Sequence, residues 1–262
     1  MANFDRNAYP TYGSGMAGAG AAVYDQGLRS YMLGIYNHMV LGLAISGLVA
    51  FGMFMLATTT DPAMAVARMS NGTMLTEFGR TLYVSPLKWL LMLAPLAFIF
   101  VLSWRSERAS YTSLLGMFWA FATVMGVSMA TIFMVFTSAS IAKVFFITAA
   151  TFGALSLWAY TTKRSLSGWG TFLFMGLVGL IIASIVNIFM QSSALQFAIS
   201  CIGVLVFAGF TAYDTQRLKE QYDYVVGDAV AMGKASIMGA LSLYLDFINL
   251  FQSLLSILGD RE

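Results

Sequence analysis

The stretch ASIMGALSLYLDFINLFQSLLSILG, residues 235 to 259, is long and apolar enough to cross a membrane, yet it carries a carboxylate, Asp246, near its centre. A charged group facing lipid is costly, so we expect this segment either to be surrounded by other helices or to form a re-entrant segment. Its small and polar residues recur at steps of three or four and therefore share one face of a helix. These residues are Ser236, Gly239, Ser242, Asp246, Asn249, Ser253 and Ser256. Such a stripe lets other helices approach closely, which predicts that this helix lies at the centre of a bundle.

The whole chain has the composition of a polytopic membrane protein. Of its 262 residues, 59% are hydrophobic and 10% are charged, whereas about 25% are charged in a typical soluble domain. The net charge is only +2 and no basic cluster occurs, which argues against a nucleic-acid partner. The single cysteine, Cys201, and the single histidine, His38, provide neither a disulfide framework nor a pattern of metal ligands.

Six further segments have the length of about 20 mostly apolar residues that crosses a hydrocarbon core of about 30 Å. They are residues 36–56, 86–104, 113–136, 143–160, 170–190 and 195–215. Together with residues 235–259 they predict an all-α integral membrane protein with seven transmembrane helices. Residues 1–30 are polar and rich in Gly and Ala, with no signal-peptide pattern, so we expect a disordered tail before a single transmembrane domain at 31–262.

The distribution of Lys and Arg predicts the orientation of the chain. If all seven segments cross, nine of the 14 basic residues fall on the side of the N-terminus and five on the other side. The positive-inside rule then places the N-terminus in the cytoplasm. Counting residues leaves open whether the last segment crosses, which puts the C-terminus outside, or re-enters and keeps it inside.

A second carboxylate, Asp214, lies near the end of the sixth segment, in GFTAYDTQRLKEQYD at 209–223. One interpretation is a local ion pair with Arg217, three residues further on, worth a few tenths of a kcal/mol. The other is that Asp214 faces inward and meets Asp246. Two carboxyls in a poorly solvated place cannot easily both ionise, so they would share a proton and respond to pH. They could also touch calcium, but weakly and transiently, because calcium usually collects about six to eight oxygens.

The two segments ALSLYLDFINLF (240–251) and FAGFTAYDTQRLK (207–219) resemble the paired C-terminal signature of the Bax inhibitor family, the transmembrane Bax inhibitor motif proteins with bacterial members. The number and length of the spans extend the resemblance over about residues 30–258. It implies a seven-helix fold whose C-terminal helix is enclosed by the other six, acting as a proton-sensitive calcium leak in a bacterial plasma (inner) membrane.

The resemblance also implies roles for particular residues. Aspartates at the positions of Asp214 and Asp246 form the pH sensor of the family, and an arginine matching Arg105, in LSWRSERAS at 102–110, latches the first of them in the closed state. Ser242, Asn249 and Ser253 are expected to support the pair as parts of its polar stripe. Residues 90–100 lack the carboxylate that some members carry in this span.

Two functions remain open at this stage. The first is a pH-sensitive calcium (cation) leak channel gated by the aspartate pair, without a cofactor. The alternative is a membrane interaction protein, because some bacterial relatives are associated with the FtsH protease, which could grip the N-terminal tail. The aspartates would then be structural and fix helix register. We expect no enzyme, since no nucleophile with a base, metal cluster or phosphate loop occurs, and no broken helix pair favours a carrier.

Overall fold

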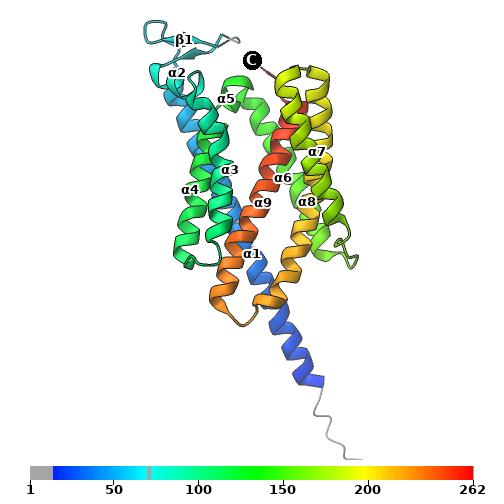
Figure 1. Cartoon of the computed structure of the whole chain (residues 1–262). Coiled ribbons are helices and arrows are strands. Elements are labelled where there is room, and N and C mark those ends of the chain that lie inside the picture. The colour runs from blue at the N-terminus through cyan, green and yellow to red at the C-terminus, as the bar shows by residue number, and fades with distance from the viewer. Residues whose placement is uncertain (1–13, 70–71, 262) are drawn as a thin grey trace, which may run out of the picture.

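The computed structural model describes residues 14–69 and 72–261, and seven of the helices in these ranges are long and apolar enough to cross a membrane. These are α1 (Ser14–Ala57), α3 (Leu87–Arg105), α4 (Tyr111–Met129), α6 (Ser138–Thr161), α7 (Trp169–Met190), α8 (Ser193–Val225) and α9 (Ala229–Leu258). They run side by side along the molecule, as Figure 1 shows. The predicted all-α fold with seven spans is confirmed.

The last helix, α9, runs from one end of the bundle to the other. The turn that joins it to α8 lies at the lower end in Figure 1, and the C-terminus lies at the upper end. The helix therefore does not re-enter, which decides the alternative that the sequence left open. It is also the most buried span. Half (50%) of the residues in its most apolar stretch of 18 residues are buried, against 11–33% in the corresponding stretches of the other six spans. Its main contacts are with α1, α4, α6 and α8, whereas α3 packs on α4 and α7 packs on α8.

The first helix extends into the region predicted as a tail. Residues 1–13, which include much of the segment suggested for the FtsH protease, lie outside the described residues, but α1 begins at Ser14 instead of after residue 30. Leu28 is buried, and the rings of Tyr24 and Tyr31 pack on Tyr222 of α8, with ring centroids 5.3 and 5.6 Å apart. Contacts with α8 thus stabilise a stretch that is too polar to be recognised as a span.

Short elements close the upper end of the bundle. Strands β1 (Ala67–Arg68) and β2 (Met74–Leu75) pair antiparallel, and α2 (Glu77–Tyr83) follows them. A small core packs Leu75 against Ala57 of α1 and Met134 of α5 (Ile132–Val135). The chain end is attached here too, because the backbone N–H of Asp260 donates to the hydroxyl of Ser140 at 2.9 Å.

A buried polar contact joins α1, α4 and α9 near mid-length. The hydroxyls of Tyr244 and Ser46 lie 2.6 Å apart, and the Ser46 hydroxyl reaches the carbonyl of Ala122 at 2.8 Å. Tyr244 is fully buried, and its ring packs edge-on against Phe118 and Phe121. The Tyr244 side chain can take this position in only one rotation of α9, so the contact helps to orient Asp246, which lies two residues further along.

On its other side, α8 is attached to α6 and to the loop after α6. The side-chain amide of Gln216 accepts from the N–H of Leu166 at 2.6 Å and donates to the carbonyl of Arg164 at 2.8 Å. The ammonium of Lys219 donates to the carbonyl of Tyr160, in the last turn of α6, at 2.8 Å. These bonds fix the rotation of α8 and leave its opposite face toward α9.

A close approach between the backbones of α1 and α4 gives a stability prediction. A Cβ atom added at Gly126 of α4 would lie 2.6 Å from the backbone oxygen of Ser46, so Gly126→Ala should push α1 and α4 apart. We expect a loss of about 1–3 kcal/mol in the free energy of unfolding, measured by thermal unfolding in detergent. Gly116→Ala is the control on the same helix, because its Cβ meets nothing within 4 Å. Equal melting temperatures for the two variants would contradict the packing described.

The attachment of α8 gives a second prediction. Gln216→Ala leaves the N–H of Leu166 and the carbonyl of Arg164 without their partner, at a cost of about 1–3 kcal/mol. The melting temperature should fall accordingly. Gln26→Ala, at an exposed position of α1, is the matched control and should change little. A similarly small effect at Gln216 would show that the loop is held by other contacts.

Candidate functional site

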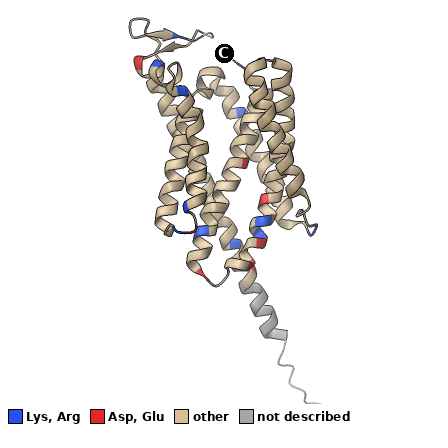
Figure 2. Ribbon diagram, viewed as in Figure 1, with Lys and Arg blue, Asp and Glu red and all other residues tan. Residues whose placement is uncertain are grey.

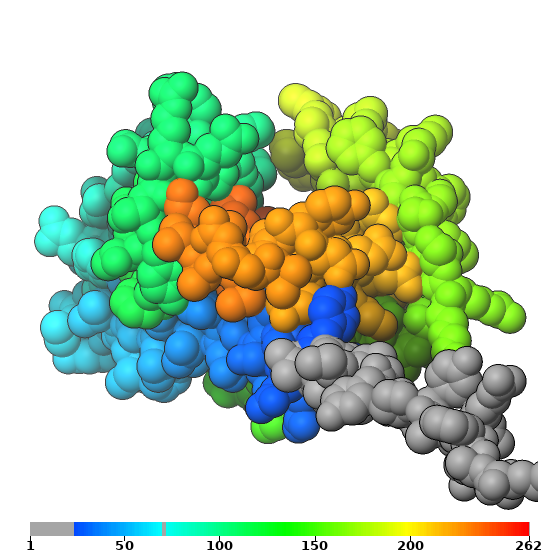
Figure 3. Space-filling model, turned by 90° about the horizontal axis from the view of Figure 1, so that it is seen from below, coloured from blue at the N-terminus to red at the C-terminus, as the bar shows by residue number. Residues whose placement is uncertain are grey.

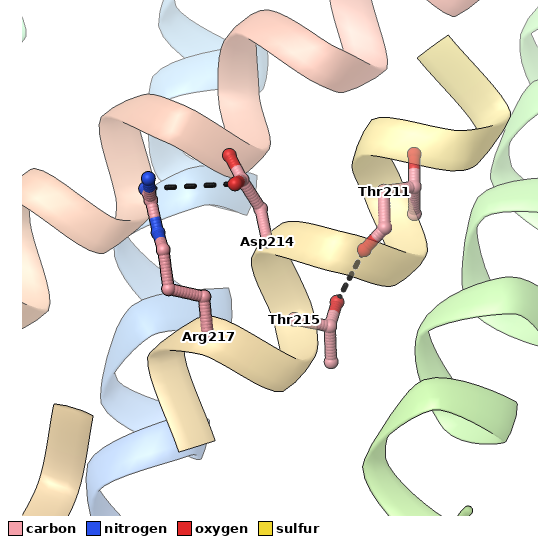
Figure 4. A network of polar contacts seen from close by, with 4 residues as sticks. All are labelled: Thr211, Asp214, Thr215 and Arg217. Carbon is pink, nitrogen blue, oxygen red and sulfur yellow. Dashed lines mark hydrogen bonds and ion pairs between the residues drawn. The ribbon is translucent and has the colours of Figure 1, made fainter. Parts of the chain in front are cut away.

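The two predicted carboxyls lie on neighbouring helices and are both buried. Asp214 of α8 is 7% exposed and Asp246 of α9 is 6% exposed. Figure 4 shows the side chain of Asp214 pointing from α8 toward the adjoining helix, while Thr215 points to the other side. The inward orientation that the sequence offered as one interpretation is therefore the one that the structure has.

The contact register of α8 and α9 gives the relative depth of the two carboxyls. Gly239 faces Leu218, and Gly203 faces Ser253, so the helices run antiparallel with these positions opposite each other. This register sets Asp214 opposite Ser242 and sets Asp246 opposite Phe210 and Thr211. Asp246 therefore lies about four residues, or ~6 Å along the helix axis, further from the lower end than Asp214.

The local ion pair is present as well. Nη2 of Arg217 lies 3.5 Å from Oδ1 of Asp214, as the dashed line in Figure 4 marks. The Arg217 side chain is 51% exposed, whereas that of Asp214 is 10% exposed. The two interpretations of Asp214 are thus compatible, because one carboxyl both faces α9 and pairs with an arginine at the surface.

Asp246 has fewer polar partners than Asp214. Its Oδ2 atom is fully buried and accepts no hydrogen bond from any described residue. It lies within electrostatic reach of Asp214 and Arg217. Since more than about 90% of buried polar groups in proteins are hydrogen-bonded, such an atom calls for an explanation: a proton, a water molecule or an ion.

A cleft opens beside this pair at the lower end of α8 and α9. Its volume is about 430 Å³, and it is lined by Arg217, Leu218, Glu220, Gln221, Tyr224, Met238, Gly239 and Ser242. From below, the α8–α9 hairpin occupies the centre of this end, orange in Figure 3, and the surface is hollowed between α4 and α7. The cleft reaches Arg217 and Ser242, one helical turn from Asp214 and Asp246 respectively.

The predicted supporting residues of α9 form hydrogen bonds within their own helix. The amide of Asn249 donates to the carbonyl of Leu245, and the hydroxyl of Ser253 donates to the carbonyl of Asn249, both at 2.8 Å. Ser242 lies in the wall of the cleft. All three side chains are partly exposed and lie on the polar stripe of α9, which reaches the cleft wall at Ser242. No described hydrogen bond joins them to Oδ2 of Asp246.

The predicted latch, Arg105, lies apart from the pair in this structure. It is the exposed last residue of α3, and α3 packs on α4, so that α9 stands between α3 and α8 (Figure 1). The arginine that pairs with Asp214 is Arg217. A latch contact of Arg105 would need a different arrangement of helices, so its role stays a prediction.

Sequence reasoning missed a chain of hydroxyls beside the site. Tyr36 of α1 bonds Ser156 of α6, and Ser156 lies 2.9 Å from the hydroxyl of Thr215 on α8, whose Oγ1 donates to the carbonyl of Thr211 (Figure 4). The signal available was that every apolar span contains at least one Ser or Thr. Such residues usually bond their own helix, and nothing in the sequence distinguishes the ones that link helices.

The described residues contain no group of three or more His, Cys, Asp or Glu side chains that could hold a metal ion. Nδ1 of His38 bonds the carbonyl of Gly34 at 2.7 Å, and Cys201 is a half-buried free thiol. Two carboxyls alone would supply fewer oxygens than calcium collects in a tight site.

Comparison with known proteins agrees with this architecture. Residues 28–262 match the family described as inhibitor of apoptosis-promoting Bax1. A protein of Caulobacter vibrioides is 43% identical over 91% of both chains. The inner membrane protein YbhL of Escherichia coli is 41% identical over 90% of this chain and 94% of its own. The chain is therefore an integral membrane protein that belongs to the Bax inhibitor family.

Proposed function

We propose that this protein is a pH-sensitive cation leak channel, with calcium as a transported ion, and that Asp214 and Asp246 gate it. The observation that carries the proposal is the buried, unpartnered Oδ2 of Asp246, one turn beyond an ion pair that borders an open cleft. An ionisable group at this depth is expensive, and in membrane proteins such groups mark ion and proton pathways.

A purely structural role for the aspartates is less well supported. A polar residue that only fixes helix register is expected to be fully hydrogen-bonded, because a half-satisfied polar core destabilises the fold. Asp246 accepts no hydrogen bond at Oδ2 from the described residues. Register between α9 and its neighbours is already provided by the Tyr244–Ser46 contact.

The gate is proposed to work through protonation of the pair. The charged groups within electrostatic reach of Asp246 are Asp214 and Arg217, and Arg217 also forms the ion pair with Asp214. A proton on Asp214 removes the charge that holds Arg217, and a proton on Asp246 removes the charge that α9 buries. Changing from mostly closed to mostly open takes about 5.5 kcal/mol of differential stabilisation, so both protons contribute.

We further propose that the lower end faces the cytoplasm of a bacterial cell and that the membrane is the plasma (inner) membrane. The described basic residues on the N-terminal side of the spans lie at or near the lower ends of their helices, where Figure 2 shows most of the blue ribbon. They are Arg29, Arg105, Arg108, Lys163, Arg164, Arg217, Lys219 and Lys234. The YbhL relative is named as an inner membrane protein.

Substitution of the aspartates tests the channel function. We expect Asp214→Asn and Asp246→Asn each to change calcium flux into proteoliposomes by several-fold and to flatten its dependence on pH, because each removes one titrating group. Asp25→Asn, at an exposed position of α1, is the control and should behave as wild type. Flux and pH dependence that remain unchanged in both variants would refute the gating role.

The direction of the pH response is a separate prediction. Acidification places protons on the pair and releases Arg217. Calcium flux should therefore rise when the medium at the lower end of the protein is changed from mildly alkaline to mildly acidic. Flux measured with a calcium indicator, at equal calcium gradients and matched internal pH, checks this. A monotonic fall in calcium flux over the same pH range would contradict this direction. It would show that the ionised carboxyls bind the passing cation and that their charge does not keep the channel closed.

A further inference from the structure

We infer that the cleft between α8 and α9 is the entrance for cations and that Arg217 is the side chain that closes it. This inference rests on the proposed leak function and adds the route to the pair and a residue that controls access. The route differs from one closed by Arg105, because the pairing arginine here belongs to α8 itself.

The first argument is the depth of the charged groups along α8. Lys219 bonds the last turn of α6, close to Trp158 and to the basic residues that follow α6, and such residues mark the headgroup layer. Glu220 lies next to that level, and charged groups follow inward from it at intervals of about one turn: Arg217 and Asp214 on α8, and then Asp246 on α9. The cleft wall contains Glu220 and Arg217, and Arg217 connects it to Asp214 through their ion pair.

The second argument is the chemistry of the cleft wall. Glu220 supplies a carboxylate, and Gln221, Tyr224 and Ser242 supply neutral oxygens. Oxygen ligands suit a hard cation such as calcium, and a volume of about 430 Å³ has room for an ion that keeps part of its water shell. The positive group in the wall, Arg217, is already turned to Asp214.

The third argument is that Arg217 is weakly held. Its 3.5 Å contact with Asp214 is longer than the ~2.7–2.9 Å of a good charge-assisted hydrogen bond. Half of its side chain is exposed, and it has no hydrogen bond to another described residue. Arg217 can therefore turn into water at little cost.

The test compares two arginines at the same end of the protein. In proteoliposomes at mildly alkaline pH, Arg217→Gln should raise calcium influx several-fold, while Arg105→Gln should match wild type and Arg217→Lys should restore most of the closure. Glu220→Gln should raise the calcium concentration that gives half-maximal influx. Melting temperatures of all variants in detergent identify any that do not fold.

The outcomes separate this inference from the proposed function. If wild type conducts and responds to Asp246→Asn, but Arg105→Gln opens it and Arg217→Gln does not, the leak function stands and the entrance is assigned wrongly. If wild type shows no influx at any pH, the leak function fails and this inference fails with it.

A second measurement is independent of flux. In a Cys201→Ser background, Ser242→Cys should react with a membrane-impermeant thiol reagent applied from the lower end, and faster when Arg217→Gln is added. A thiol at residue 242 that does not react in either background would show that the cleft is closed to water, which overturns the assignment.

Discussion

The structure depends on the cost of burying a carboxylate in hydrocarbon. Asp246 cannot face lipid, so α9 must be shielded by other helices, and α1, α4, α6 and α8 do this. Close shielding requires small residues, which is why Gly239 packs against Leu218 and Gly203 against Ser253. Many large apolar side chains also face outward, and Phe189 and Leu205 are among the most exposed. The bundle is thus arranged around one charge.

The second carboxyl is positioned by bonds on the far side of its helix. Three side chains attach α8 to α6 and its following loop: Thr215, Gln216 and Lys219. None of these hydrogen bonds involves Asp214 or Asp246. The stretch from Tyr213 to Lys219 therefore combines two roles on two faces. One face fixes the rotation of the helix, and the other presents Asp214 and Arg217 to α9 and the cleft.

The spans and the central place of Asp246 were predictable, because apolar length and a polar stripe at steps of three and four follow directly from the energetics of lipid. The helix ends were not. Hydropathy ends the sixth span at residue 215, but α8 continues to Val225, since its charged last turns pack on the beginning of α1 and not on lipid. The same packing makes residues 24–30 helical where a tail was predicted.

The pairing of charges was predictable only in part. Spacing identified Arg217 as a partner for Asp214, and it left open whether Asp214 also faces α9, because that depends on the rotation of α8. The role that the resemblance implies for Arg105 stays a prediction. A matched position in the chain does not determine which helices stand between two side chains, and in this arrangement α9 lies between α3 and α8.

If the proposed gate operates, the magnitudes assign different parts of it to different residues. An ion pair with a half-exposed arginine is worth about 0.2–1 kcal/mol, whereas a near-complete shift between closed and open states takes about 5.5 kcal/mol. Release of Arg217 therefore supplies only a small part of this energy, enough for a several-fold change in access but not for a near-complete shift. The larger energy must reside in the buried Asp246, whose unpaired oxygen carries the cost of desolvation until a proton or a cation relieves it. In this gate, Arg217 of α8 controls the access of ions, and Asp246 of α9 supplies most of the free energy of opening. The two helices meet at the cleft.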